Sequence, residues 1–286
     1  MRILLCTDGS EDARQAAAFV GQLRLPPEAE VRLLAVVESG RHDERLDDSL
    51  AMLQNILEGH QVHPDRVTRV GKIAEEILEE ASEGHYDLVA IGAPARHGLL
   101  TQRLATTASR LAHDLRAPLL IARSVPASIQ HMLLCTSGEG PAIQTLRHGG
   151  RLVSLIDASV SVVHVMSQVT LSLQAPLEDL TMSSEEAIEK GTREGRHLME
   201  AVKLLRESGV SQNITPRLRH GLVVDEILEE LREGNYDLLV VGAHTIPARS
   251  RWMDVMLDDI TNQFIARSPC SVLVIWHDPK DWPARI

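Results

Sequence analysis

Short apolar runs alternate with amphipathic stretches in the first part of the chain. The apolar runs have the length of strands and lie at residues 3–7, 31–37, 66–70, 86–92 and 118–122. Between them, apolar residues recur at helical spacing at 11–23, 46–57, 74–82 and 102–115, and Gly84 follows the third helix as a C′ glycine. This alternation predicts a parallel sheet covered by helices on both faces. We expect the strand order 3-2-1-4-5, with ligands at the carboxyl ends of strands 1 and 4.

The same series of elements occurs twice. LLCT at Leu4 returns at Leu133, residues 71–92 match residues 221–242 at 12 of 22 positions, and residues 116–123 correspond to 270–277. Pro126 and small residues mark a linker at 124–128. The chain therefore divides into two α/β domains, 1–126 and 127–286. We expect two five-stranded sheets that superpose on each other, rather than one continuous sheet.

Composition and charge narrow the function classes. The 286 residues carry a formal net charge of −11, and only 2 % of them are aromatic, so we expect no binding to nucleic acid or to an anionic membrane surface. No apolar run approaches the roughly 18 residues of a membrane span, and no targeting segment is visible. The three cysteines form no CxxC pair, which favours a reducing compartment. The sequence thus predicts a cytoplasmic protein.

The motifs identify a family resemblance that covers essentially the whole chain. TDGSE follows the first strand, YDLVAIG follows a helix with a terminal glycine, and a short last strand follows Pro118. In this pattern the chain resembles the universal stress proteins in their tandem form. The resemblance implies two flavodoxin-like domains, similar also to the adenine-nucleotide α-hydrolases, and a non-enzymatic role in the stress response.

The nucleotide-binding branch of that family has a glycine-rich phosphate motif after the fourth strand, in which backbone N–H groups and a helix N-terminus hold the phosphates. The first copy keeps the motif's spacing but has alanine at two of the glycine positions. The resemblance therefore implies an adenine-nucleotide site, for ATP or a relative with Mg²⁺, made by Asp8, the backbone near Val37, Gly92, Ala95, Ala105, Thr106 and Thr107. Thr106 and Thr107 either hold a phosphate or cap the following helix. In the second copy Thr245 and Val255, or Asp258 and Asp259, take the motif positions, so we expect no phosphate binding there.

The two copies also differ at the first turn, where Asp8 corresponds to Ser137. Asp8 is predicted to cap the first helix in a capping box with Glu11, and Ser137 is able to cap as well. In the nucleotide-binding relatives the aspartate lies against the adenine–ribose end of the ligand. The two roles of Asp8 are compatible, and only the first copy keeps the carboxylate.

Other candidate residues favour structural interpretations. His60 and His63 lack the further ligands of a zinc site and are assigned to a solvated loop, so we predict no metal. Cys6 and Cys135 are predicted to be inert core residues, and Tyr86 and Tyr236 to be packing residues. Four glutamates of the third helix are predicted to form a solvated acidic face: Glu75, Glu76, Glu79 and Glu80. No set of nucleophile, base and orienting residue is apparent, so we predict no enzyme.

Two functional hypotheses remain. The first is a stress-response regulator that binds adenine nucleotide weakly in its first domain. The second is a nucleotide-free module that docks an unknown protein partner through its pseudo-dimeric surface. Single-domain relatives dimerise through their last strands, because an open sheet edge has unpaired N–H and C=O groups. We therefore expect strands 119–122 and 272–275 to pair within one chain. The sequence does not decide whether two such chains also form a homodimer.

Overall fold

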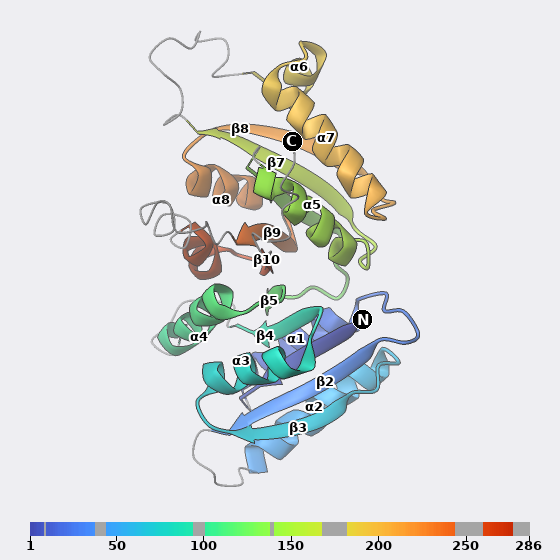
Figure 1. The fold of residues 1–286 in the computed structure, drawn as a ribbon, viewed down its shortest axis with the longest axis vertical. Coiled ribbons are helices and arrows are strands. Elements are labelled where there is room, and N and C mark those ends of the chain that lie inside the picture. Colours follow the sequence, from blue (N-terminus) through green and yellow to red (C-terminus); the bar gives the residue numbers. More distant parts are fainter. Residues whose placement is uncertain are drawn as a thin grey trace.

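The computed structural model describes residues 1–8, 10–37, 44–93, 101–137, 140–167, 182–243 and 260–276. Its strands form one ten-stranded sheet in the order β3-β2-β1-β4-β5-β10-β9-β6-β7-β8. The first half of the chain forms one end of the molecule and the second half the other, with β5 and β10 meeting in the middle (Figure 1). Within each half the strand order is the predicted 3-2-1-4-5.

Each half has the predicted alternation of strands and helices. The first half consists of β1 (Arg2–Thr7), α1 (Ala13–Gly21), β2 (Glu30–Val37), α2 (Glu44–Gly59), β3 (Asp65–Val70), α3 (Ile73–Gly84), β4 (Leu88–Gly92), α4 (Thr101–Asp114) and β5 (Leu119–Ala122). The second half consists of β6 (His131–Thr136), α5 (Gly140–Val153), β7 (Ser159–Ser167), α6 (Ser184–Glu189), α7 (Arg193–Glu207), β8 (Ile214–Gly221), α8 (Val223–Gly234), β9 (Leu238–Ala243) and β10 (Ser271–Trp276). Residues 260–267 are also helical.

The last strands of the two halves pair with each other, as predicted. β5 and β10 run antiparallel, with Leu120 opposite Leu273, whereas neighbouring strands within each half run parallel. The expectation of two separate sheets is wrong, because this pairing joins the two five-stranded units into one sheet. The join satisfies the backbone groups of both edges, which would otherwise face water.

Two hydrophobic cores cover the two faces of the sheet, and both continue through the join. Leu120 and Leu273 belong to the core beneath α1, α2, α5 and α7. Leu119 and Val274 belong to the core beneath α3, α4, α8 and the helical residues 260–267. Because adjacent strand residues face opposite sides, each apolar residue of the paired edges contributes to one core or the other.

Gly84 does not have the predicted role of a left-handed C′ residue. It is the last residue of α3, and His85 adopts the left-handed conformation with φ 52°. A Cβ on Gly84 would lie 2.7 Å from Cζ of Tyr86, so the glycine makes room for that ring. Gly234 and Tyr236 repeat the arrangement in the second half, where Asn235 is the left-handed residue.

The linker is held by hydrogen bonds from Gln15 of α1 and from Gln22, which directly follows that helix. The Gln15 side chain accepts from the Val125 N–H (2.7 Å), while the Gln22 side chain donates to the Pro126 carbonyl (2.8 Å) and accepts from the Ile129 N–H (2.9 Å). These bonds fix the path of the chain between the two halves.

A buried arginine connects the halves beside the linker. Arg123 is only 7 % exposed, and its guanidinium donates to the carbonyls of Ser268 (3.0 Å) and Ile265 (2.7 Å) at the end of the helical residues 260–267. Burial lowers the pKa of Arg123. The partial negative charge of a helix C-terminus favours the cation at this place.

We expect Val274→Lys to expose the paired edges and promote self-association. Val274 is buried opposite Leu119, and an ammonium group there would lie in an apolar core without a partner. Light scattering after size exclusion should show oligomers, and the denaturation midpoint should fall. Val70→Lys, at an exposed position of the outer strand β3, is the matched control and should behave as the parent. A monodisperse Val274→Lys protein of parental stability would contradict the pairing.

Candidate functional site

Three of the predicted site residues lie at one edge of the first half. Val37 and Gly92 end β2 and β4, and Asp8 follows the last residue of β1. Since β1 pairs in parallel with both β2 and β4, these carboxyl ends meet at the same edge of the sheet. This edge contains the switch point between β1 and β4, where open α/β sheets bind ligands.

Asp8 does not cap α1 as predicted. The helix begins at Ala13, and Asp12 holds the N-cap position without a cap hydrogen bond from its side chain. Residues 11 and 12 form a turn that separates Asp8 from the helix, so the capping box with Glu11 is wrong. Instead, Asp8 is exposed and its Oδ1 accepts the Ser10 N–H at 3.0 Å.

Three carboxylates follow one another closely at this turn. Burial raises the pKa of Asp12, and the charges of Asp8 and Glu11 raise it further. The negative charge of Asp8 is therefore part of a local acidic field. A ligand at this edge would have to present a hydroxyl or amine to Asp8, or a cation such as Mg²⁺ alongside its phosphates.

Gly92 has a packing role that the phosphate motif did not reveal. A Cβ at this position would lie 2.5 Å from the Ala13 backbone nitrogen and would overlap the Asp12 carbonyl. The glycine thus lets the start of α1 approach β4. Gly242, the equivalent residue of the second half, lies in the same way against the Thr145 side chain. Glycine at this position therefore does not by itself distinguish a nucleotide site.

The predicted phosphate residues at 105–107 lie within α4 rather than at its start. The helix begins at Thr101, so Ala105, Thr106 and Thr107 occupy its second turn and do not cap it. Alanine in place of glycine favours a helix that extends further toward its N-terminus. Ala95 lies outside the described residues, as do Thr245, Val255, Asp258 and Asp259 of the second half.

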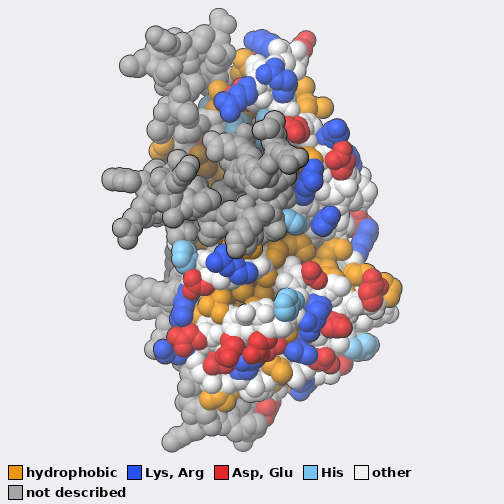
Figure 2. Space-filling model, in the orientation of Figure 1, with side chains coloured by type: hydrophobic (Ala, Val, Ile, Leu, Met, Phe, Trp, Pro, Cys, Tyr) orange, Lys and Arg blue, Asp and Glu red, His pale blue; other side chains and the backbone are white. Residues whose placement is uncertain are grey.

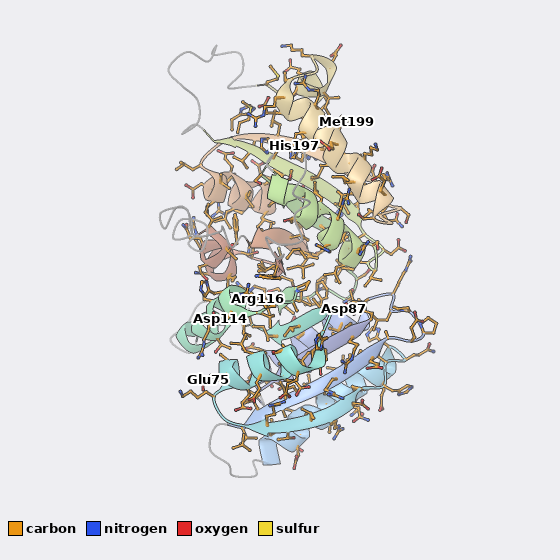
Figure 3. All side chains as sticks on the ribbon, viewed as in Figure 1. Glu75, Asp87, Asp114, Arg116, His197 and Met199 are labelled. Atoms are coloured by element: carbon orange, nitrogen blue, oxygen red, sulfur yellow. The ribbon has the colours of Figure 1, made fainter. Side chains whose placement is uncertain are left out.

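A histidine cluster occupies the corresponding edge of the second half. His197 of α7 (Figure 3) is hydrogen-bonded through Nε2 to Thr136 Oγ1 at 2.8 Å, and His164 of β7 donates from Nδ1 to the Thr136 carbonyl at 3.0 Å. The two rings meet edge to face, 5.2 Å apart. Burial and the neighbouring His164 lower the pKa of His197 to about 4. The sequence did not reveal this cluster, because β7 and α7 come together only in the folded chain.

The prediction that Glu75, Glu76, Glu79 and Glu80 of α3 are all solvated is wrong. Glu75 is exposed and paired with Lys72 at 3.2 Å (Figure 3), whereas Glu80 is buried with 4 % exposure. Figure 2 shows acidic and basic side chains interspersed over the first half, in keeping with such ion pairs. The acidic face is therefore partly neutralised and one of its members belongs to the interior.

Glu80 organises a buried cluster. Its Oε1 accepts from the Tyr86 hydroxyl at 2.7 Å and from Arg32 at 3.2 Å, and its Oε2 accepts from Arg69 at 2.9 Å. Burial alone would raise the pKa of Glu80, but these bonds outweigh it and lower that pKa. Burial together with Glu80 raises the pKa of Tyr86 to about 12. Tyr86 is thus a hydrogen-bonding residue as well as a packing residue, and Tyr236 makes the same bond to Glu230 at 2.8 Å.

Other candidates show no reactive arrangement. Burial raises the pKa of the Cys6 and Cys135 thiols, as expected of core residues. His60 and His63 are exposed in the turn after α2. Among the residues that the structure describes, no group of three or more His, Cys, Asp or Glu side chains could hold a metal ion. Within the same residues, no helix is long and apolar enough to cross a membrane.

The fold defines the class of protein, a tandem of two α/β domains with open sheets of order 3-2-1-4-5. The sequence model of the universal stress protein family matches residues 1–123 and again residues 128–275. The chain therefore belongs to that family. No curated protein matches the sequence.

Solved structures that match nearly the whole chain share this architecture. A universal stress protein from Archaeoglobus fulgidus DSM 4304 is 18 % identical, with a TM-score of 0.67 over 98 % of this chain and 97 % of that one. A protein of unknown function from Pseudomonas aeruginosa PAO1 is 16 % identical, with a TM-score of 0.61 over 97 % and 92 %. A universal stress protein in complex with cAMP is 19 % identical, with a TM-score of 0.39 over 53 % and 99 %. At 18 % and 16 % identity, the likeness to the two structures that match nearly the whole chain shows the fold alone.

We expect acid to destabilise the fold partly through His197. Its pKa is about 4 in the fold against an ordinary value of 6.5, so between these pH values the unfolded chain binds a proton that the folded chain does not. Stability should therefore fall as the pH drops from 6.5 to 4. In His197→Gln this decline, measured by urea denaturation, should be shallower. His63→Gln, which changes an exposed histidine, is the control and should show the same decline as the parent. An unchanged pH profile in His197→Gln would contradict the assignment.

Proposed function

We propose that this universal stress protein is a non-enzymatic stress-response regulator whose first half binds ATP or a related adenine nucleotide weakly. The observation that carries the proposal is a difference between two halves of the same fold. The first half has the exposed carboxylate of Asp8 at the β1–β4 switch point, and the second has Ser137 there. A carboxylate at that point can accept hydrogen bonds from ribose hydroxyls.

The second half supports a single site per chain. At its edge the carbonyl and hydroxyl of Thr136 are already engaged by His164 and His197. A nucleotide at this edge would have to displace that partly buried cluster. The second half is therefore proposed to bind no nucleotide and to have a structural role.

The absence of a catalytic role is part of the proposal. Within the described residues the cysteines are buried or partly buried, with raised pKa values, and thiolates rather than thiols are nucleophiles. A regulator needs only to bind and release its ligand. Nucleotide occupancy would then report the energetic state of the cell to a protein partner.

One observation favours the second candidate, a nucleotide-free interaction module. Ala105 and Thr106 lie inside α4, so they do not form a helix N-terminus for phosphate. Such a module would act through its pseudo-dimeric surface on a partner protein, and its first half would then be as empty as its second.

We expect calorimetric titration with ATP and Mg²⁺, and separately with cAMP, to find one site per chain. Asp8→Ala should weaken binding about tenfold, the effect of one lost hydrogen bond to a charged group. Ser137→Ala is the matched control in the second half and should bind as the parent does. Two equivalent sites, or an Asp8→Ala protein of parental affinity, would contradict the proposal. No heat with either nucleotide would favour the nucleotide-free module.

A further inference from the structure

The second half contains a cavity at the opposite end of its sheet from the histidine cluster. It has a volume of about 440 Å³ and lies where the amino ends of β7 and β8 meet the last turn of α8. Its lining includes Ser159, Ser161, Thr215, Arg217, Glu230 and Tyr236. The volume lies within the range of small-molecule sites. This cavity shares no residue with the proposed nucleotide site, so its function is independent of that proposal.

The internal repeat shows what fills the equivalent space in the first half. The strand registers make Arg2, Glu30, Arg32 and Asp65 equivalent to His131, Ser159, Ser161 and Thr215. In the second half, long charged side chains are thus replaced by a histidine and three small hydroxyl residues. The cavity lies where the first half has two arginines.

Both arginines of the first half occupy this place through specific contacts. Arg32 donates to Glu80 Oε1 at 3.2 Å. Arg2 donates to the Gly84 carbonyl, and its guanidinium lies over the Tyr86 ring, 5.1 Å from the centroid. A carboxylate, a carbonyl and an aromatic face thus form a receptor for guanidinium groups.

The second half keeps this receptor without the arginines. Glu230, Gly234 and Tyr236 are the equivalents of Glu80, Gly84 and Tyr86, and all three line the cavity. The Tyr236 hydroxyl donates to Glu230 Oε1 at 2.8 Å, and Arg219 donates to Oε2 at 2.7 Å, as their counterparts do in the first half. Among the described residues of the second half, no arginine donates a hydrogen bond to Oε1 as Arg32 does in the first half. We infer that the cavity binds the guanidinium group of a ligand, such as free arginine or another alkylguanidinium.

The charges around the cavity are compatible with such a ligand. Arg219 is bonded to Glu230 and Glu233, and Arg217 Nε lies 3.8 Å from Glu230 Oε1, beyond hydrogen-bonding distance. The Arg217 side chain is 48 % exposed, so it partly neutralises Glu230 without filling the cavity. Its equivalent in the first half, Val67, carries no charge. A bound guanidinium would therefore compete with Arg217 for the carboxylate.

Calorimetric titration with arginine, agmatine and citrulline tests the inference. Citrulline has nearly the same shape as arginine but carries a neutral urea group in place of the guanidinium. Arginine and agmatine should bind at one site per chain, and citrulline at least tenfold more weakly, because it lacks the charge that Glu230 recognises. Equal binding of arginine and citrulline, or no binding of arginine and agmatine, would overturn the inference.

Variants copied from the first half make the test specific. Ser161→Arg supplies the side chain that Arg32 provides, so it should fill the cavity and abolish arginine binding. Arg217→Val removes the competing cation and should tighten binding severalfold. Undiminished binding by Ser161→Arg would overturn the inference. Loss of binding in Arg217→Val would identify an anion site and overturn it as well.

The first half offers a reciprocal control. Because Arg2 and Arg32 both occupy this place, Arg2→His combined with Arg32→Ser should open an equivalent site there, so that a double variant with native circular dichroism binds a second equivalent of arginine. A folded double variant without that second site would overturn the inference, because the receptor was identified from its contacts in the first half. Peptides with a central arginine or citrulline identify the source of the ligand. Binding by the arginine peptide indicates a protein side chain, and binding by free arginine alone indicates a small molecule.

Discussion

The antiparallel pairing of β5 with β10 is the interaction on which the architecture depends. A parallel α/β domain of this order ends in an open strand, and its backbone groups need partners. Leu120 and Leu273 lie opposite each other at the join and belong to one core, while their neighbours belong to the other. The pairing therefore satisfies two edges and joins two cores at once. The linker bonds from α1 and the buried Arg123 stabilise the geometry that the strands establish.

Duplication has allowed the two ends of the sheet to diverge while the framework is repeated. Both halves keep a tyrosine that donates to a buried glutamate, and both keep an arginine on the other oxygen of that carboxylate. The carboxyl edges differ, with Asp8 in one half and the Thr136 histidine cluster in the other. The amino ends differ too, since Arg32 is replaced by Ser161. Each half thus supplies a structural reference for a site in the other.

The fold could be predicted from the sequence more completely than the site. Periodicity located the strands and helices, the repeat identified two copies of the last strand, and the family resemblance implied that these two copies pair. The candidate site was harder to predict, because its residues were assigned one by one from the family's phosphate motif and not from contacts in the fold. Gly92 proved to accommodate the start of α1, and Asp8 proved to be separated from the helix that it was expected to cap. Both findings concern contacts between α1 and the sheet, which local spacing does not encode.

The sequence by itself determined the domain number, because hydrophobic periodicity and the repeat show two copies of one series of elements. The strand order followed from the fold class that this alternation indicates, and the pairing of the last strands from the resemblance to single-domain relatives. Tertiary structure decided which polar residues are buried together. Glu80 belongs to the same run of helix glutamates as the exposed Glu75, yet it meets Tyr86 and two arginines from neighbouring strands. The cavity beside Tyr236 arises in the same way, from changes on several strands that are far apart in the chain. Packing brings such residues together, and the energy of a buried charge depends on the partners that packing provides.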